Sequence, residues 1–309
     1  MSETYDLIII GAGPAGSAGS IYASRCFSLD TLVFDGSPGG QMAEARQLAN
    51  YPGFKNISGW ELMENMLEQA KSFGVEIKTK KVTTVREREG VFVVSTEEET
   101  YQAKTVLVAI GAGPRKLGVP GEEEFIGKGI SYCALCDAPF YKDKVVGVVG
   151  GGDSALDGAL ELLEHVKKIF LIHRREEFRA KPLFVQKIKE AENVELVLKR
   201  NVVRVEGEEM VNKLILDMPY QGADFLKVDG VFIEIGNVPD REFLEDIGLE
   251  TIEQGYVPVA EDMSTNIEGI YSAGDVTTAS NGVKQIVTAC SEGVIAAKSI
   301  YNYLRKEGR

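Results

Sequence analysis

Two of the four cysteines in this chain lie three positions apart, at Cys133 and Cys136, and Asp137 follows them directly. Cysteines at this spacing can form a disulfide between neighbouring positions of a helix, and the dipole at a helix N-terminus favours the reactive thiolate. Asp137 can supply or accept the proton that thiol–disulfide exchange requires. The three residues therefore predict a redox-active site. In it Cys133, nearer the expected helix start, is the expected attacking cysteine.

A pair of cysteines can instead hold a zinc ion or lie inert in the core. A structural zinc ion takes four ligands, and the chain has no second cysteine pair and only two histidines. An inert pair fits poorly with a position beside strand–turn–helix units. We therefore expect no metal site. The single cysteines, Cys26 and Cys290, are expected to be small buried hydrophobic residues of helices.

A glycine-rich turn near the N-terminus lies between an apolar strand and a helix of small residues. Gly11, Gly13 and Gly16 form the pattern Gly-x-Gly-x-x-Gly. These glycines allow a tight turn, a close approach of the backbone to a pyrophosphate and close helix–strand packing. The N–H groups of the helix then face the phosphates. The next expected strand, 31–34, ends at Asp35, whose carboxylate can accept hydrogen bonds from ribose hydroxyls. This segment predicts a dinucleotide site.

The same order of elements recurs after the cysteine pair. A strand leads into the turn at 150–155, where Ala155 takes the place of the last glycine, as the pattern permits. Asp35 lies 24 positions after Gly11, and Arg174 lies 24 positions after Gly150. Arginine thus replaces the acidic residue that reads the ribose. Arginine binds a 2′-phosphate that a carboxylate would repel, so the second unit predicts NADP(H) rather than NAD(H). The alternative is a solvated basic patch.

Alternating strands and helices predict an α/β fold with parallel sheets, and two copies predict two Rossmann-like nucleotide-binding domains. One domain is expected to hold a flavin and the other a nicotinamide, so that a hydride passes to the flavin and then to the disulfide. The β-rich segments 91–110 and 201–218 are expected to form antiparallel excursions. If the last segment completes the first domain, the second domain is an insertion within it.

The composition limits the possible partners. The net charge of −13 argues against nucleic acid and anionic membranes, both of which attract basic surfaces. No segment is long and apolar enough to cross a bilayer, and the first apolar run follows acidic residues rather than the basic residues of a signal peptide. We expect no nucleic acid or membrane partner, and we expect the protein in the cytoplasm.

Together these motifs resemble the low-molecular-weight thioredoxin reductases of bacteria and archaea over nearly the whole chain. The segments that carry the resemblance are 11–16, 39–41, 50–53, 133–137, 150–155, 173–180 and 269–276. The resemblance implies FAD, NADPH, a thioredoxin or thioredoxin-like acceptor, and a homodimer. It implies three-layer ββα domains, with an FAD domain formed by 1–117 and 244–309. The NADPH domain, 118–243, carries the cysteine pair and is inserted between them. In this family the domains rotate, so that the disulfide and the nicotinamide reach the flavin in turn.

The resemblance also assigns cofactor-binding residues. Those implied for FAD are Gly11, Gly13, Ala15, Gly16, Asp35, Gly40, Gln41, Asn50, Val82, Gly274, Asp275, Gln285 and Ile286. Those implied for NADPH are Gly152, Asp153, Ser154, Ala155, His173, Arg174, Arg175 and Arg179. Asp275 is implied to contact the ribityl chain, and 284–286 to lie at the edge of the isoalloxazine ring.

Three other functions remain to be distinguished. Flavoproteins that reduce ferredoxin or flavodoxin generally lack the cysteine pair, and dithiol oxidases lack the basic cluster of the second unit. A non-enzymatic NADP sensor needs no thiolate chemistry, so replacing both cysteines would leave its function intact. Some archaeal relatives take electrons from a donor other than NADPH, against which the intact arginine cluster argues.

Overall fold

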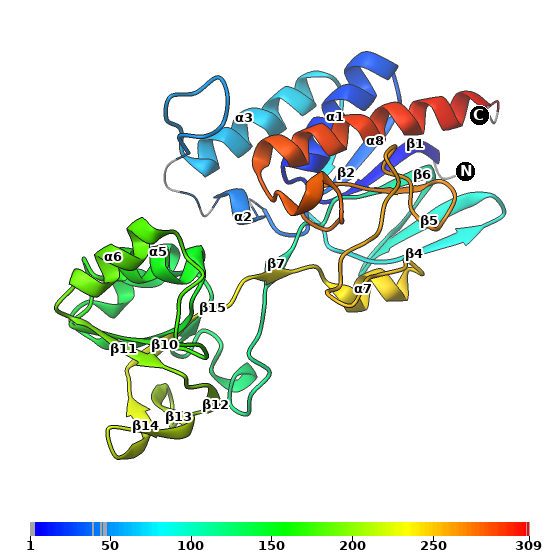
Figure 1. The fold of residues 1–309 in the computed structure, drawn as a ribbon. Coiled ribbons are helices and arrows are strands. Elements are labelled where there is room, and N and C mark those ends of the chain that lie inside the picture. Colours follow the sequence, from blue (N-terminus) through cyan, green and yellow to red (C-terminus); the bar gives the residue numbers. More distant parts are fainter. Residues whose placement is uncertain (1–3, 39, 44, 46–47, 307, 309) are drawn as a thin grey trace. The chain divides into compact units, whose positions relative to one another are not determined.

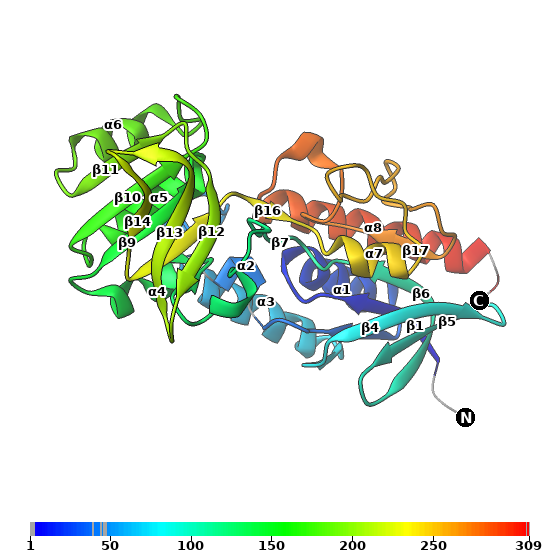
Figure 2. The same cartoon turned by 90° about the horizontal axis from the view of Figure 1, so that it is seen from below.

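The computed structural model describes residues 4–38, 40–43, 45, 48–306 and 308, and the chain forms two compact units (Figure 1). The first unit comprises Met1–Gly113 and Val238–Arg309, and the second comprises Pro114–Asn237. The sequence interpretation placed these limits after residues 117 and 243. The chain passes between the units at β7 (Gly113–Pro114) and β16 (Asn237–Val238), which pair with each other (Figure 2).

The first unit contains a seven-stranded sheet in the order β3-β2-β1-β6-β5-β4, with β17 also paired to β6. Its strands are β1 (Thr4–Ile10), β2 (Thr31–Phe34), β3 (Glu76–Lys78), β4 (Val82–Arg88), β5 (Val91–Thr96), β6 (Thr100–Val108) and β17 (Ile270–Ser272). β1, β2, β3, β6 and β17 pair in parallel. Leu7 to Ile10 are all buried, as expected of a parallel strand covered on both faces.

The expectation of an antiparallel excursion over 91–110 was only partly right. β4, β5 and the first part of β6 are antiparallel neighbours, but the same β6 pairs in parallel with β1 and β17. β6 is therefore a central strand of the main sheet. Its buried residues 105–108 show no alternation, because both faces of that part are covered.

The helices of the first unit include two that cross closely. Its helices are α1 (Pro14–Phe27), α2 (Gly40–Ala43), α3 (Gly59–Ser72), α7 (Arg241–Asp246), the short η3 (Ser280–Gly282) and α8 (Ile286–Lys306). α1, α3 and α8 lie on the same face of the sheet (Figure 1). A side chain at Gly293 of α8 would lie 2.0 Å from the carbonyl oxygen of Ala15. A glycine is needed there because the two helices approach so closely.

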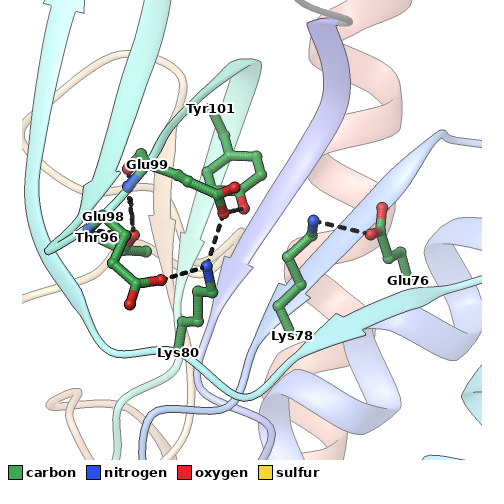
Figure 3. A network of polar contacts seen from close by, with 7 residues as sticks. All are labelled: Glu76, Lys78, Lys80, Thr96, Glu98, Glu99 and Tyr101. Carbon is green, nitrogen blue, oxygen red and sulfur yellow. Dashed lines mark hydrogen bonds and ion pairs between the residues drawn. The ribbon is translucent and has the colours of Figure 1, made fainter.

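A polar network joins β3 and the following segment to the β5–β6 turn at the edge of this sheet (Figure 3). The ammonium of Lys80 lies 2.9 Å from a carboxylate oxygen of Glu98 and 2.7 Å from one of Glu99. Tyr101 donates a hydrogen bond to Glu99, and Lys78 pairs with Glu76 at 3.1 Å. All these groups are partly or fully exposed, so the network contributes little to the stability of the unit.

The second unit has three layers. A parallel sheet in the order β11-β10-β9-β15-β8 lies between helices and an antiparallel sheet in the order β12-β13-β14 (Figure 1). Its strands are β8 (Ile130–Ser131), β9 (Val145–Gly150), β10 (Lys168–His173), β11 (Val194–Leu198), β12 (Val202–Gly207), β13 (Val211–Tyr220), β14 (Ala223–Lys227) and β15 (Gly230–Glu234). Its helices are η1 (Glu123–Phe125), α4 (Ala134–Asp137), η2 (Ala138–Tyr141), α5 (Asp153–Leu162) and α6 (Pro182–Glu190).

Neighbouring residues of the central strands supply two separate cores. Val148 and Leu171 pack with the helices, whereas Val149 and Ile172 pack with the antiparallel sheet. This alternation is the period-two pattern of a strand buried on both faces, and it confirms the three-layer α/β architecture. Among the described residues, every helix is too short or too polar to cross a membrane.

Candidate functional site

The first glycine turn has two glycines that the fold requires and one that faces open space. Gly11 has φ +108°, and a Cβ there would lie 2.2 Å from the carbonyl oxygen of Ala109. A Cβ on Gly16 would lie 1.9 Å from the carbonyl oxygen of Gly11. A Cβ on Gly13 would have no atom within 4 Å. Gly13 is also the N-cap of α1, so a pyrophosphate fits at this bare backbone before the helix N-terminus.

Asp35 directly follows β2. It lies near the glycine turn, since the N–H of Gly11 donates a hydrogen bond to the carbonyl of Phe34 at 2.8 Å. Its side chain is only 6% exposed, and burial raises the pKa of the carboxyl group above its ordinary value. A buried carboxylate gains most from ligand donors that replace its lost hydration. Ribose hydroxyls are donors of this kind.

Residues far apart in the sequence meet elsewhere in the first unit. The side-chain amide of Asn50 donates to the side-chain oxygen of Gln285 at 2.9 Å, across 235 positions. Gln41 donates to the backbone carbonyl of Ala112, and Ile286 begins α8. Val82 lies in the hydrophobic core at 4% exposure, so only its backbone can reach a ligand. Gly39 of the 39–41 motif lies outside the described residues.

Asp275 lies on a loop that a buried carboxyl group organises. Glu292 of α8, 4% exposed, accepts hydrogen bonds from the N–H of Gly274 at 2.8 Å and from the hydroxyls of Thr277 and Ser280 at 2.9 and 2.6 Å. Gly274 in turn packs against Ala15, since a Cβ there would lie 2.9 Å from the Cβ of Ala15. The loop is thereby fixed beside the first turn.

Charges of both signs surround Asp275. Burial raises the pKa of its carboxyl group, and the ammonium of Lys284 partly offsets this effect. Lys284 donates to the carbonyl of Thr277 at 2.6 Å and lies 4.8 Å from the centre of the Tyr256 ring. Burial lowers the pKa of Lys284.

The second glycine turn repeats the arrangement of the first. A Cβ on Gly150 would lie 2.2 Å from the carbonyl oxygen of Glu234, whereas beside Gly152, the N-cap of α5, no atom lies within 4 Å. The bare backbone at Gly152 thus corresponds to that at Gly13. Ser154 is exposed and Ala155 is buried in the core below the turn.

Three arginines of the second unit, Arg174, Arg175 and Arg179, are close to one another and exposed. The charges of Arg179 and Arg174 lower the pKa of Arg175, which shows mutual repulsion. In the part of the chain that the structure describes, none of the three has a carboxylate within 4.0 Å. A cluster of unpaired guanidinium groups beside a dinucleotide turn is suited to a phosphate group.

His173, placed with these arginines by the sequence, has a different environment. Its side chain is 8% exposed, stacks on Phe178 and lies directly beneath Gly151, where a Cβ would be 2.3 Å from the imidazole. Burial is the main cause that lowers its pKa, and the three arginine charges lower it further. The ring faces the protein rather than solvent.

Cys133 and Cys136 form a disulfide, with their Cα atoms 5.3 Å apart. Cys133 is the N-cap of α4, and its Sγ accepts a hydrogen bond from the N–H of Cys136 at 3.2 Å. Cys133 is partly exposed and Cys136 exposed. The expected position of Cys133 at the helix start is therefore confirmed.

Several residues that the sequence analysis did not single out hold this pair in place. The hydroxyl of Ser131 accepts from the N–H of Cys133 at 3.1 Å, and Glu234 accepts from the N–H of Ala134 at 3.3 Å. Glu122, 2% exposed, accepts from the hydroxyl of Tyr132 at 2.9 Å, next to Cys133. Their partners lie on other segments, and no local pattern marks such contacts.

The structure tests the prediction that the two single cysteines are buried. The expectation that Cys26 is buried was wrong: it lies on α1 but is exposed, while Cys290 on α8 is partly buried. α1 buries a narrow stripe of small residues, and Cys26 lies outside it. Within the described ranges, no three His, Cys, Asp or Glu side chains are grouped as metal ligands.

Known proteins share this arrangement over the whole chain. Residues 5–293 match the family model described as pyridine nucleotide-disulphide oxidoreductase. The chain is 40% identical over 311 residues to the thioredoxin reductase of Bacillus subtilis (strain 168). The aligned region covers 99% of this chain and 97% of the relative.

Two solved structures are also similar. One is Lactococcus lactis thioredoxin reductase in the FR conformation, with a TM-score of 0.88, 34% identity and coverage of 98% of this chain and 100% of that one. The other is T. acidophilum thioredoxin reductase, with a TM-score of 0.84, 34% identity and coverage of 97% and 98%. The chain belongs to the pyridine nucleotide-disulphide oxidoreductase family, among its thioredoxin reductases.

Proposed function

We propose that this protein is an NADPH-dependent flavoenzyme that reduces the disulfide of thioredoxin or of a thioredoxin-like protein. The observation that carries the proposal is the Cys133–Cys136 disulfide, in a chain that also has two dinucleotide turns. The relatives described above are thioredoxin reductases and match this chain along its full length. A flavoprotein that reduces ferredoxin or flavodoxin has no use for the cysteine pair.

FAD is assigned to the first unit. Its pyrophosphate fits the bare backbone at Gly13, and Asp35 accepts hydrogen bonds from its ribose. Asn50 and Gln285, which hydrogen-bond to each other, and Asp275 are assigned to the flavin end. Gly40, Gln41, Ile286 and the backbone of Val82 complete the set. What supports the assignment is that segments from both ends of the chain form this unit and that Gly274 and Gly293 pack against Ala15 beside the turn.

NADPH is assigned to the second unit. Its pyrophosphate fits the bare backbone at Gly152 and the start of α5, and Arg174, Arg175 and Arg179 bind the 2′-phosphate. The mutual repulsion of these arginines supports this assignment, because a phosphate dianion relieves it.

The chain's own residues carry out the second half of the reaction. When bound in the first unit, FAD would supply the two-electron transfer between NADPH and a disulfide. With two protons, these electrons open the Cys133–Cys136 bond to two thiols. The Cys133 thiolate attacks one sulfur of the thioredoxin disulfide and displaces the other. Cys136 then attacks the mixed disulfide at Cys133, which restores the pair and releases thioredoxin with two thiols. Asp137 is the group proposed to carry the protons.

The proposal extends to the assembly and the compartment. A homodimer in the cytoplasm is proposed on the family resemblance alone. Sedimentation of the FAD-loaded protein tests the dimer, and a monomer at micromolar concentration contradicts it.

Turnover with purified components tests the function. FAD-loaded protein is mixed with NADPH and a thioredoxin from the same source, and NADPH absorbance is followed. We expect steady oxidation of NADPH, and loss of this activity in the Cys133→Ser/Cys136→Ser variant. Bleaching of the flavin without reduction of thioredoxin would reject the acceptor, and failure of NADPH to bleach the flavin would reject the donor.

A further inference from the structure

Asp153 is an unexpected residue at a phosphate site. It is the first residue of α5, directly after the bare backbone of Gly152. A carboxylate in the first turn of helix α5 interacts favourably with the helix dipole. The same carboxylate repels a pyrophosphate bound at the start of that helix. The side chain therefore needs another partner if the turn is to accept a dinucleotide.

The structure shows this partner. Oδ1 of Asp153 accepts a hydrogen bond from the backbone N–H of Lys181 at 2.8 Å, and Oδ2 lies 3.4 Å from the Lys181 ammonium. Lys181 is the N-cap of α6 and closes the segment 174–181, which we call the arginine loop. Asp153 thus holds the far end of the arginine loop against the start of α5.

Three further contacts hold the same loop. The backbone N–H of Arg179 donates to the carbonyl of Gly151 at 2.8 Å. Nε2 of His173 lies 3.2 Å from the carbonyl of Glu177, and the ring stacks on Phe178 at 5.5 Å while packed beneath Gly151. The glycine turn is therefore joined to the middle of the arginine loop through His173, and to its second half at Arg179 and Lys181.

We infer that Asp153 and His173 are positioning residues for NADPH specificity. They fix the arginine loop to the glycine turn, so that the guanidinium groups are already in place for the 2′-phosphate. This inference rests on the proposed assignment of NADPH to the second unit. Without these contacts the loop has to be ordered when the ligand binds, and that ordering costs affinity for the 2′-phosphate alone.

Binding of the oxidised dinucleotides tests the inference without turnover. NADP⁺ and NAD⁺ differ only in the 2′-phosphate, so the ratio of their dissociation constants, measured by calorimetry on FAD-loaded protein, isolates this group. Asp153→Ala removes the acceptor for Lys181, and Asp153→Asn keeps the acceptor but removes the charge. Any repulsion between Asp153 and the pyrophosphate is the same for both ligands and cancels in the ratio.

We expect Asp153→Ala to reduce the preference for NADP⁺ by about three- to tenfold, the worth of one hydrogen bond. Asp153→Asn should keep the preference within about twofold, because the exposed ion pair contributes little. His173→Phe, which keeps the stacking but loses the hydrogen bond, should also reduce it. Thermal unfolding of each apo-protein shows whether the variant is folded.

The outcomes separate this inference from the proposed function. An unchanged preference in Asp153→Ala overturns the positioning role, as does an equal loss in Asp153→Asn and Asp153→Ala. A wild-type protein that binds NADP⁺ no better than NAD⁺ overturns the donor assignment and, with it, this inference.

Discussion

Among single residues, the two cysteines differ in ways that bear on their roles. Cys133 caps α4, and its sulfur accepts the N–H of Cys136. Once the disulfide is open, the same N–H stabilises a thiolate at Cys133, since charge-assisted hydrogen bonds are the stronger kind. Among the described residues, no N–H donates to the sulfur of Cys136, and this difference favours Cys133 as the attacking cysteine.

The attacking role can be tested with single variants. We expect Cys136→Ser to form a stable mixed disulfide with a thioredoxin that keeps one cysteine, activated as its thionitrobenzoate adduct. Cys133→Ser should react at least about tenfold more slowly, because it lacks the stabilised thiolate. Release of thionitrobenzoate and non-reducing electrophoresis report the reaction. Faster trapping by Cys133→Ser would reverse the two roles.

Asp35 is expected to favour cofactor binding at the expense of apo-protein stability. Its pKa is raised by burial, so the folded apo-protein binds a proton more tightly than the unfolded chain. The contribution of Asp35 to stability is therefore lost as the pH rises through the folded pKa. At neutral pH, we expect Asp35→Asn to unfold no more easily than the wild type, yet to bind FAD about tenfold more weakly. Thermal unfolding and flavin fluorescence measure the two effects, and weaker stability with unchanged FAD affinity would contradict this role.

Among the structural elements, helix α8 holds the loop that carries Asp275 through one buried side chain, Glu292. Glu292 satisfies three donors of the loop that carries Asp275. Glu292→Ala leaves the buried N–H of Gly274 without an acceptor, at a cost of about 1–3 kcal/mol. We expect apo-protein that unfolds at lower temperature and binds FAD at least about tenfold more weakly.

Two matched variants control this experiment. Glu292→Gln keeps one carbonyl oxygen and should show a smaller loss, and Ser291→Ala, at the exposed neighbouring position, should show none. FAD affinity in Glu292→Ala equal to that of the wild type would show that the loop does not depend on this carboxyl group.

The elements also show what a sequence can and cannot reveal. Gly11 and Gly150 were predictable because the steric needs of a strand–turn–helix unit act between neighbours. Glu292, Glu122 and Ser131 were not, because their partners come from other segments. The burial of His173 under Gly151 was not predictable either, because it depends on how the strand after α5 packs against the glycine turn.

In the whole molecule, the chain keeps its two dinucleotide turns in separate compact units. The cysteine pair belongs to the unit assigned to NADPH, while FAD is assigned to the other. The chain links these units through β7 and β16. Under the proposed function, electrons must pass from the nicotinamide to the flavin and then return to the cysteines of the same unit.

Reductive titration with NADPH in the absence of oxygen tests this path most directly. A flavin and a disulfide each take two electrons. The wild type should therefore consume about two equivalents of NADPH before the flavin is fully bleached, and should gain two thiols. The Cys133→Ser/Cys136→Ser variant should consume about one equivalent. A wild type that is bleached by one equivalent and gains no thiols would contradict the claim that the electrons of NADPH reach Cys133 and Cys136.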